Sequence, residues 1–380
     1  MFEVRKKVRV KVLHFTDVIN RFDFIDNIIR HIDKDSFEVG LCLSEPKSNI
    51  QSPSYAEDFP LWVVPSRGRR HFLHVARALA RILQIWDADI VHTHHYDQAV
   101  IGWLATRMRS QTKLIVGRHY SDAIYRLSSG MKRSVYLKVE GVVNDAAARI
   151  IVPSKYIFDI LVNRQGVDPS KVDIVYYGFD PQKYHLPDAE EAAKAREALG
   201  LEGRFVVGTF ARLHEEKGHR FLLEAISQVR ERIPQLFWVV VGEGPERSVL
   251  EREVEARSLQ EKVRFLGWRK DAIKIMAIVD AVVQPTLQEA FSQVMAEAMW
   301  MGKPLVITDV SGAVDIIRHG ENGMMVPKAD PAALSSVLVE LATNSRLRAN
   351  LGVEGRRFVE DNLIIEKIIG KYQESYLRAL

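Results

Sequence analysis

The sequence predicts an α/β protein built from two Rossmann-like domains, each with a doubly wound parallel sheet. Three observations lead to this fold class. Short apolar strand-like runs alternate with helical patterns, the alternation breaks once near residue 180 and then restarts, and the 380 residues suit two domains of about 150 to 200 residues each. Because apolar strands that alternate with helices form parallel βαβ units, each half is expected to form one open sheet.

The first half contains seven strand-like runs with helical stretches between them. The clearest helical stretches are residues 22–32, 71–86 and 132–143. The strand-like runs are VRVKVLHF, FEVGLCL, LWVV, DIVHTH, KLIVGRH, RIIVPS and VDIVYYG. This alternation predicts one complete Rossmann-like domain.

The segment that begins YYGFDPQKYHLPDAEE interrupts the pattern with Pro181, Pro187 and an Ala/Glu-rich helical patch, which places the domain boundary near residue 180. The pattern then restarts with the runs RFVVGTFARL, LFWVVVGEG, VRFLGW, AVVQPT and KPLVITD. After Pro331 only helical patterns follow. We therefore predict domains at residues 1–180 and 181–364, with the last helix, about 365–380, packed back on the first domain.

Composition limits the class of protein. The chain is 47% hydrophobic and 27% charged, as in ordinary globular proteins. Its single cysteine, Cys42, excludes an intramolecular disulfide and suits a reducing compartment, so a cytoplasmic location is expected. The N-terminal run favours a strand over a signal peptide, and no apolar run reaches the roughly 18 residues of a membrane span. Any membrane contact is expected to be peripheral.

The net charge of +4 is concentrated in the first half, where a basic helical segment follows residue 65. Its arginines are Arg67, Arg69, Arg70, Arg77 and Arg81, interspersed with apolar residues at helical spacing. We favour a surface helix packed on a sheet, and keep contact with an anionic membrane as the alternative. Nucleic-acid binding is not expected, because no known nucleic-acid motif is present.

Two cations follow the first strand of the second half. Arg212 and Lys217 lie in the run TFARLHEEKGH between a strand and a helix. Cations beside a helix N-terminus favour a phosphate site, although solvated loop charges are equally compatible. Further on, Gly242 and Gly244 are expected to form a tight turn that lets backbone approach a ligand, since the third glycine of a dinucleotide motif is absent.

The run QEAFSQVMAEAMWMG carries the most chemical information. A helix is predicted from about Ser292 to Met301, preceded by Glu289 and containing Glu297. The N–H groups of residues 290–293 are expected to hold phosphate oxygens. Because a carboxylate would repel phosphate, Glu289 and Glu297 are better suited to accept hydrogen bonds from sugar hydroxyls, with surface or ion-paired positions as the alternative.

With this E-x7-E spacing, the chain resembles the family 4 retaining glycosyltransferases of the glycosyltransferase B fold. The resemblance covers residues 89 to 327 and includes Arg212, Lys217 and the run GKPLVITDVSGAVDIIRHGENGMMVP. It implies an acceptor-side first domain and a second domain that binds the nucleotide sugar. It also implies that Arg212 and Lys217 stabilise the leaving diphosphate, Glu289 binds the donor sugar and Glu297 the ribose. The implied diphosphate and sugar contacts are the amides of Ala290, Phe291, Ser292 and Gln293, and Trp268 and Arg269 flank the base.

Histidines cluster at strand ends of the first half. His92 and His94 share one face of a strand, but no Asp, Glu or Cys ligand is evident nearby, so no metal is expected. The family resemblance maps its active-site histidine onto His119. His94 and His95, with Thr16 and Asp17 at the end of the first strand, are assigned to the acceptor side; a structural role at the strand end is equally compatible.

Three positions depart from the family pattern. The run HFTDVINRFDF after the first strand has no glycine, Ala290 replaces a frequent glycine, and Ser311-Gly312 replaces a glycine pair. The first departure leaves the acceptor side undefined. The other two concern backbone conformation.

The family resemblance implies a retaining hexosyltransferase. It is expected to move a sugar from a nucleoside diphosphate sugar, with UDP as the commonest carrier, to a hydroxyl acceptor such as a glycan, lipid-linked glycan or polysaccharide precursor. No cofactor, metal or nucleic-acid partner is expected, and peripheral contact with an anionic membrane is kept as an alternative. The alternatives are a nucleotide-sugar epimerase or glycoside phosphorylase on the same fold, and a catalytically silent subunit that binds nucleotide sugars.

Overall fold

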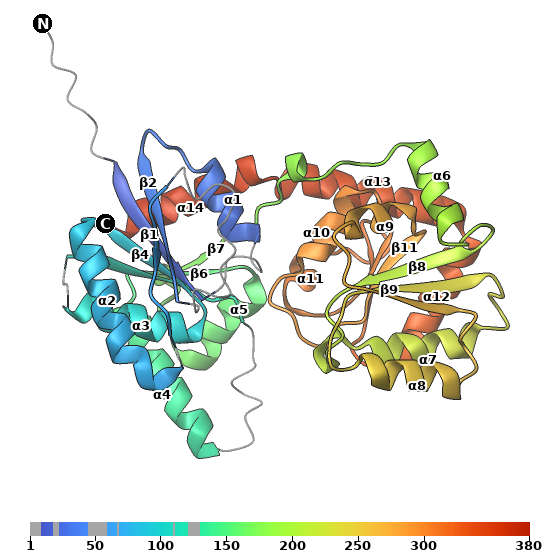
Figure 1. Ribbon diagram of the computed structural model, residues 1–380, viewed down its shortest axis with the longest axis horizontal. Coiled ribbons are helices and arrows are strands. Elements are labelled where there is room, and N and C mark those ends of the chain that lie inside the picture. The colour runs from blue at the N-terminus through green and yellow to red at the C-terminus, as the bar shows by residue number, and fades with distance from the viewer. Residues whose placement is uncertain (1–8, 18–22, 45–58, 67, 109–110, 121–129) are drawn as a thin grey trace, which may run out of the picture. The chain divides into compact units, whose positions relative to one another are not determined.

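The structure is a computed structural model that describes residues 9–17, 23–44, 59–66, 68–108, 111–120 and 130–380 (Figure 1). The chain divides into two compact units. Unit 1 comprises residues 1–178 and 365–380, and unit 2 comprises residues 179–364. The expected boundaries were residues 180 and 364. Arg67 and residues 18–22 of the glycine-free run lie outside the described residues.

Unit 1 contains a parallel sheet of seven strands. Its strands are β1 (Val10–Thr16), β2 (Phe37–Leu43), β3 (Leu61–Val63), β4 (Ile90–His94), β5 (Lys113–Gly117), β6 (Arg149–Val152) and β7 (Val172–Ile174). They lie in the order β3-β2-β1-β4-β5-β6-β7, so the direction of winding reverses between β1 and β4. The register pairs His14 with Leu41 on one side and with His92 on the other. Each run predicted as a strand in this half forms one.

Helices cover both faces of this sheet (Figure 1). They are α1 (Asp23–His31), α2 (Phe72–Ile85), α3 (Tyr96–Met108), α4 (Gly130–Ala146), α5 (Lys155–Asp159) and α14 (Ile365–Ala379). The basic helix α2 buries Val75, Ala76, Leu79 and Leu83. The favoured interpretation of a surface helix packed on the sheet is therefore confirmed, because the apolar stripe of α2 is used by the core.

Unit 2 contains a second parallel sheet, of six strands. They are β8 (Phe205–Phe210), β9 (Leu236–Val241), β10 (Val263–Gly267), β11 (Ala281–Gln284), β12 (Leu305–Thr308) and β13 (Met324–Val326), in the order β10-β9-β8-β11-β12-β13. The winding reverses between β8 and β11. Strand β13 was not predicted, because two of its three residues, Met324 and Met325, are neither β-branched nor aromatic and give little strand signal.

The helices of unit 2 also lie on both faces of their sheet (Figure 1). They are α6 (Ala189–Ala198), α7 (His219–Val229), α8 (Arg247–Ala256), α9 (Ala272–Ile278), α10 (Gln293–Trp300), α11 (Ser311–Ile316), α12 (Pro331–Thr343) and α13 (Ser345–Asn362). Buried Trp238 anchors the core, and its indole N–H donates to the Thr209 hydroxyl at 2.9 Å. The two units together show the predicted fold class.

None of the helices in the described part of the chain combines the length and the apolarity needed to cross a bilayer.

Candidate active site

The topology of each sheet explains where its functional side chains gather. In open parallel sheets, ligands bind beyond the carboxyl ends of the strands, at the point where the strand order reverses. In unit 2 this point lies between β8 and β11, which lead directly to Lys217 and Glu289. In unit 1 it lies between β1 and β4, which end near Asp17 and His95. Residues distant in sequence therefore converge within each unit.

In unit 2, Lys217 and Glu289 form a direct ion pair. The Lys217 ammonium donates to Glu289 Oε2 at 2.6 Å, and the two side chains are 14% and 25% exposed. Neither charge is sealed from solvent, so a bound ligand can reach both. The pair places a cation and a carboxylate side by side at the strand-order reversal, which suits a ligand carrying both phosphate and hydroxyl groups.

Gly218 makes this pairing possible. Its φ of +66° lies in the left-handed region, and a Cβ there would lie 2.0 Å from the Pro285 carbonyl oxygen. The neighbouring Leu287 N–H donates to the Glu216 carbonyl at 2.8 Å. The loop that carries Lys217 is thus pressed against the backbone that leads from β11 to Glu289, and only glycine fits at the contact.

Arg212 is placed differently from Lys217. Its guanidinium donates to the Glu216 carboxylate at 3.1 Å, and its side chain is 67% exposed. In this structure Arg212 therefore belongs to a solvent-facing ion pair and does not contact Glu289. Its assignment to the diphosphate remains a prediction that requires the Glu216 partner to be exchanged for a ligand.

The N-terminus of α10 follows Glu289 closely. Ser292 caps the helix, accepting from the Met295 N–H at 3.2 Å and donating to Gln284 Oε1 at 2.7 Å. The side chains of Ala290 and Phe291 are buried, so these residues can meet a ligand only through their backbone, and the Ala290 N–H here donates to Glu289 Oε1 at 3.3 Å. Gln293 is partly buried and begins the helix. The backbone accommodates two departures from the family pattern. Ala290 does not adopt a positive φ, so an alanine is tolerated there. Gly312, the retained glycine of the usual pair, is the position where a Cβ would crowd the Phe291 ring, at 3.0 Å.

Glu297 has a partner that the sequence did not reveal. Tyr184, in the segment that follows β7, donates its hydroxyl to Glu297 Oε1 at 3.0 Å. Tyr184 stacks on Phe179 with 5.0 Å between ring centroids, and its ring lies tilted against Trp300 at 6.0 Å. The aromatic stack fixes the tyrosine, and the tyrosine in turn orients the carboxylate. A tyrosine 113 residues away in sequence carries no local signal of this contact.

Two further segments complete this edge of unit 2. Trp268 is 66% exposed after β10, and Arg269 forms a forked ion pair with Asp271 at 2.7 and 2.8 Å. An exposed indole is free to stack on a planar group. The turn at Gly242 approaches protein backbone: a Cβ there would lie 1.9 Å from the Ala211 carbonyl oxygen. The close approach expected for a ligand is thus made by the chain itself.

In unit 1, the residues assigned to the acceptor side meet at the ends of β1 and β4. Thr16 is fully buried and its hydroxyl donates to Asp17 Oδ1 at 3.4 Å. His95 adopts a φ of +73°, a strained conformation for a histidine, and its ring lies 5.5 Å from the ring of His119. Burial lowers the pKa of His95, and the nearby charge of Asp17 acts in the opposite direction.

A chain of hydrogen bonds links the remaining histidines. His14 Nδ1 lies 3.0 Å from His94 Nε2, His94 Nδ1 lies 2.9 Å from His119 Nε2, and His119 Nδ1 lies 2.8 Å from the Tyr177 hydroxyl. His92 bonds through Nδ1 to the hydroxyl of Tyr376 on α14, at 3.0 Å. His92, His94 and His119 were singled out from the sequence, whereas His14 on β1, Tyr177 after β7 and Tyr376 on α14 were not, because they are distant from these histidines in sequence.

Burial keeps these imidazoles neutral. It lowers the pKa of His14 to about 3, and it lowers the pKa of His92, His94 and His119 well below the usual histidine range, with the neighbouring histidines adding to the effect. Neutral rings can each donate one hydrogen bond and accept another. The cluster is therefore a set of uncharged donors and acceptors near neutral pH.

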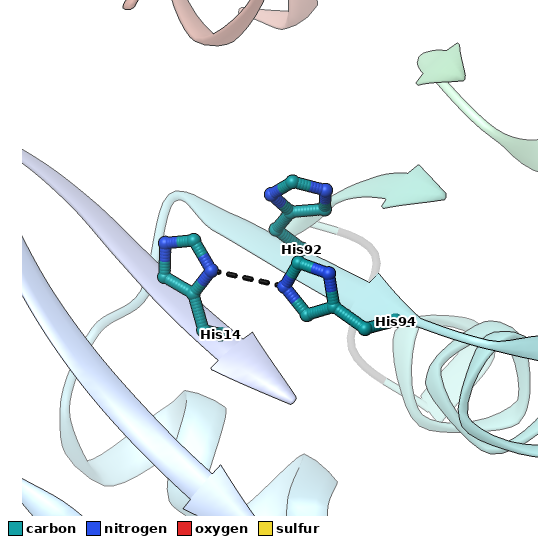
Figure 2. A group of neighbouring side chains, drawn as sticks. All are labelled: His14, His92 and His94. Atoms are coloured by element: carbon teal, nitrogen blue, oxygen red, sulfur yellow. Dashed lines mark hydrogen bonds between the residues drawn. The ribbon is translucent and has the colours of Figure 1, made fainter. Parts of the chain in front are cut away.

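Three of these histidines are also close enough to hold a metal ion. In the described part of the chain, ligand atoms of His14, His92 and His94 lie within 4.8 Å of one another (Figure 2). His14 comes from β1 and the other two from β4, and the His14–His94 hydrogen bond already joins two of the rings. The group contains no carboxylate or thiolate. The sequence-based expectation that no metal is used stays a prediction.

Comparison with known families covers both units. Residues 24–183 match the family described as Glycosyltransferase Family 4, and residues 204–344 match Glycosyl transferases group 1. Each match falls mainly within one unit. Together they span most of the chain.

Individual relatives agree with these matches. The chain is 30% identical to a D-inositol 3-phosphate glycosyltransferase of Salinispora arenicola, over 71% of this chain and 64% of that protein's length. It is 24% identical to an Escherichia coli enzyme named UDP-Gal:alpha-D-GlcNAc-diphosphoundecaprenol alpha-1,3-galactosyltransferase, over 79% and 78%.

The fold matches a solved structure over nearly its whole length. Anabaena Alr3699/HepE, solved in complex with UDP-glucose, superposes with a TM-score of 0.84 at 22% identity, covering 98% of this chain and all of that one. From these matches and the two parallel-sheet units, the chain belongs to glycosyltransferase family 4 and has the glycosyltransferase B fold.

Proposed function

We propose that this protein is a retaining hexosyltransferase that takes a sugar from a UDP-linked donor and passes it to a hydroxyl acceptor. The observation that carries the proposal is the Lys217–Glu289 ion pair beside the N-terminus of α10. It supplies a cation for a diphosphate and a carboxylate for sugar hydroxyls in one place. The UDP and UDP-glucose complexes of the Anabaena neighbour support the choice of donor.

The donor is proposed to bind by exchanging partners with this ion pair. The diphosphate takes hydrogen bonds from Lys217 and from the N–H groups at the start of α10, while a sugar hydroxyl donates to Glu289. Arg212 turns from Glu216 to the diphosphate, Glu297 accepts from the ribose, and Trp268 and Arg269 flank the base. Lys217 and Glu289 are thus both satisfied before and after binding, which limits the cost of desolvation.

Transfer then proceeds through a state in which the sugar is cationic and the diphosphate gains charge. The acceptor hydroxyl attacks the anomeric carbon on the face from which the diphosphate leaves, and its proton passes to the departing phosphate oxygen. Lys217 and the first turn of α10 stabilise the charge on the leaving group without a metal. His119 contacts the donor sugar near the reacting carbon as a neutral group.

We propose that the acceptor is a glycan, a lipid-linked glycan or a polysaccharide precursor, bound on the side of unit 1 that carries Thr16, Asp17, His94 and His95. Asp17 and His95 offer an acceptor and a polar ring for hydroxyl groups. The E. coli relative, whose printed name includes a diphosphoundecaprenol acceptor, supports a lipid-linked candidate. A cytoplasmic location with peripheral membrane contact is part of this proposal.

Helix α4 is the surface that best fits such a membrane contact. Met131, Val135 and Val142 are 80%, 55% and 49% exposed and recur at helical spacing along one stripe. Lys132, Arg133 and Lys138 on the same helix are exposed as well. Apolar side chains bordered by cations suit an anionic bilayer surface. Vesicle binding that depends neither on salt concentration nor on anionic lipid would overturn this part of the proposal.

The alternatives differ in what they do to a nucleotide sugar. The test incubates the purified chain with a panel of nucleotide sugars, with and without an extract of lipid and glycan acceptors. A transferase releases UDP only with acceptor, an epimerase yields the isomeric donor without one, and a phosphorylase needs inorganic phosphate. A silent subunit shows a donor-dependent rise in melting temperature without turnover. Acceptor-dependent UDP release is the expected result, and any of the other three would overturn the proposal.

A further inference from the structure

The hydrogen-bonded chain His14–His94–His119–Tyr177 is built from four separate parts of unit 1. His14 lies on β1, His94 at the end of β4, His119 just after β5 and Tyr177 after β7. His14 and His94 are completely buried, and Phe24 packs on both His119 and Tyr177 with ring centroids 4.5 and 4.3 Å away. Figure 2 shows the inner link between His14 and His94. This packing holds the rings in the arrangement described.

Gly117 leaves the space in which this arrangement forms. A Cβ at Gly117 would lie 2.6 Å from His119 Nε2, 2.9 Å from His92 Nε2 and 3.1 Å from His94 Nδ1. Any other residue would push the histidines apart. The glycine therefore permits the contact between His94 and His119, which lies at the centre of the chain.

The inner end of the chain determines the direction of its hydrogen bonds. Both ring nitrogens of His94 and of His119 take part in hydrogen bonds, and a neutral imidazole donates from one nitrogen and accepts at the other. The direction of one bond in the chain therefore determines the direction of the others. Among the described residues, His14 Nε2 has no hydrogen-bond partner and is buried. A buried N–H without an acceptor is less tolerated than a bare lone pair. His14 therefore carries its proton on Nδ1 and donates to His94.

We propose that His14 and His94 are positioning residues that hold His119 in its Nδ1–H tautomer, with Nε2 as the acceptor of a bond from His94. This proposal rests on the proposed function, in which His119 contacts the donor sugar. In the ligand-free chain His119 donates from Nδ1 to Tyr177, and a sugar oxygen can take the place of the tyrosine. Partners that fix the tautomer of metal-bound histidines typically matter by about 10- to 100-fold, and we expect an effect of similar size here.

Two substitutions at one position separate the two sides of His94. An asparagine amide lies where the Nδ1 of histidine lies, so His94→Asn keeps a donor toward His119. A glutamine amide lies nearer the Nε2 position, so His94→Gln keeps the contact with His14 and loses the donor. We expect His94→Gln to lower kcat by about 10- to 100-fold with little change in donor KM, and His94→Asn to retain at least about 5-fold more kcat than His94→Gln.

Ring ¹³C and ¹⁵N shifts in histidine-labelled protein report the tautomer directly, and the signal of His119 is assigned by its loss in His119→Gln. We expect the Nδ1–H form in the native chain and in Tyr177→Phe, and a mixture of tautomers in His94→Gln. This measurement needs no substrate, so it separates the present inference from the proposed function.

The two proposals fail in different ways. A native chain that shows the Nδ1–H form but no transfer with any donor leaves the tautomer assignment standing and overturns the proposed function. An Nε2–H form in the native chain, or equal kcat values for His94→Gln and His94→Asn, overturns the positioning role. If His94→Gln does not fold, His14→Asn and His14→Gln provide the same comparison one ring further in, with Asn expected to retain more activity.

Discussion

Lys217 and Glu289, 72 residues apart in sequence, meet at 2.6 Å where the strand order of unit 2 reverses. Each neutralises the other in the ligand-free chain. The pair explains how a carboxylate can lie beside a diphosphate site without repelling its ligand, because the lysine balances its charge until a sugar hydroxyl and a phosphate oxygen take over. Four further features of the molecule lead to measurable expectations.

The Tyr184–Glu297 contact predicts an effect on donor binding. Tyr184→Phe removes the hydroxyl that orients Glu297 but keeps the aromatic stack, so we expect the donor KM to rise about 3- to 10-fold with kcat nearly unchanged. Glu297→Gln should show the larger increase. Steady-state kinetics measure both, with Tyr156→Phe in unit 1 as the control. Unaltered KM values in both variants would contradict the ribose assignment.

Gly218→Ala should damage both stability and activity. The new Cβ would clash with the Pro285 carbonyl oxygen, so the loop carrying Lys217 must move away from Glu289. We expect a loss of about 1 to 3 kcal/mol and at least 10-fold slower turnover. Gly203 is the matched control: its φ is +67° and nothing lies within 4 Å of its Cβ position. Equal losses in the two alanine variants would show that backbone strain alone, and not the contact, matters.

Unit 1 should lose stability in mild acid. The pKa of four histidines, His14, His92, His94 and His119, is lowered by burial, so between about pH 6.5 and the lower folded-state values the unfolded chain binds more protons. Stability is then full about one pH unit or more above 6.5 and falls as the pH drops through 6.5, by up to about 1.4 kcal/mol per pH unit for each histidine.

The dependence of stability on pH is measured by urea denaturation at several pH values. Pulses of hydrogen exchange, read on peptides of β4 and β5, report the unfolding of unit 1. Peptides of β8 and β9 serve as the internal reference, because in unit 2 the described histidine with a lowered pKa is His219, at about 4. His14→Phe should flatten the slope for unit 1. A slope no steeper for unit 1 than for unit 2 would show that the cluster is not held neutral.

Transfer should not require a metal ion. The positive charge at the diphosphate is proposed to come from Lys217, Arg212 and the start of α10, so EDTA should change the initial rate by less than about two-fold. The rates with EDTA, with added Mg²⁺ and with added Mn²⁺ are compared on one preparation. Loss of activity in EDTA that returns with metal would contradict this expectation and direct attention to His14, His92 and His94.

The sequence predicts those features of the fold that leave a local pattern of apolar residues or prolines. Periodic runs and prolines identified both sheets and a boundary near residue 180, because buried parallel strands are strongly apolar. Strand β13 was missed because two of its three residues are methionines, which give little strand signal. Strand order within a sheet is not a local property, so the reversals at β1/β4 and β8/β11 had to come from the structure.

The candidate site divides in the same way. Lys217, Glu289 and Glu297 lie in motifs that a sequence displays, and the chemistry of phosphate and hydroxyl binding makes sense of them. No such motif marks Tyr184, Tyr177 or His14, since each contacts a partner between 58 and 113 residues away in sequence. Arg212 shows the opposite case: its motif predicts a ligand contact, while in the ligand-free chain Glu216 holds it.

The most direct test of the central claim is acceptor-dependent release of UDP from a UDP-sugar by the native chain, Lys217→Ala and Glu289→Ala. Lys194→Ala is the control, because Lys194 forms an exposed ion pair with Glu190 on α6 of the same unit. We predict that both site variants lose at least about 100-fold in turnover while stability changes by no more than about 1 kcal/mol and the control stays at the native rate. Native turnover in both Lys217→Ala and Glu289→Ala would contradict the account.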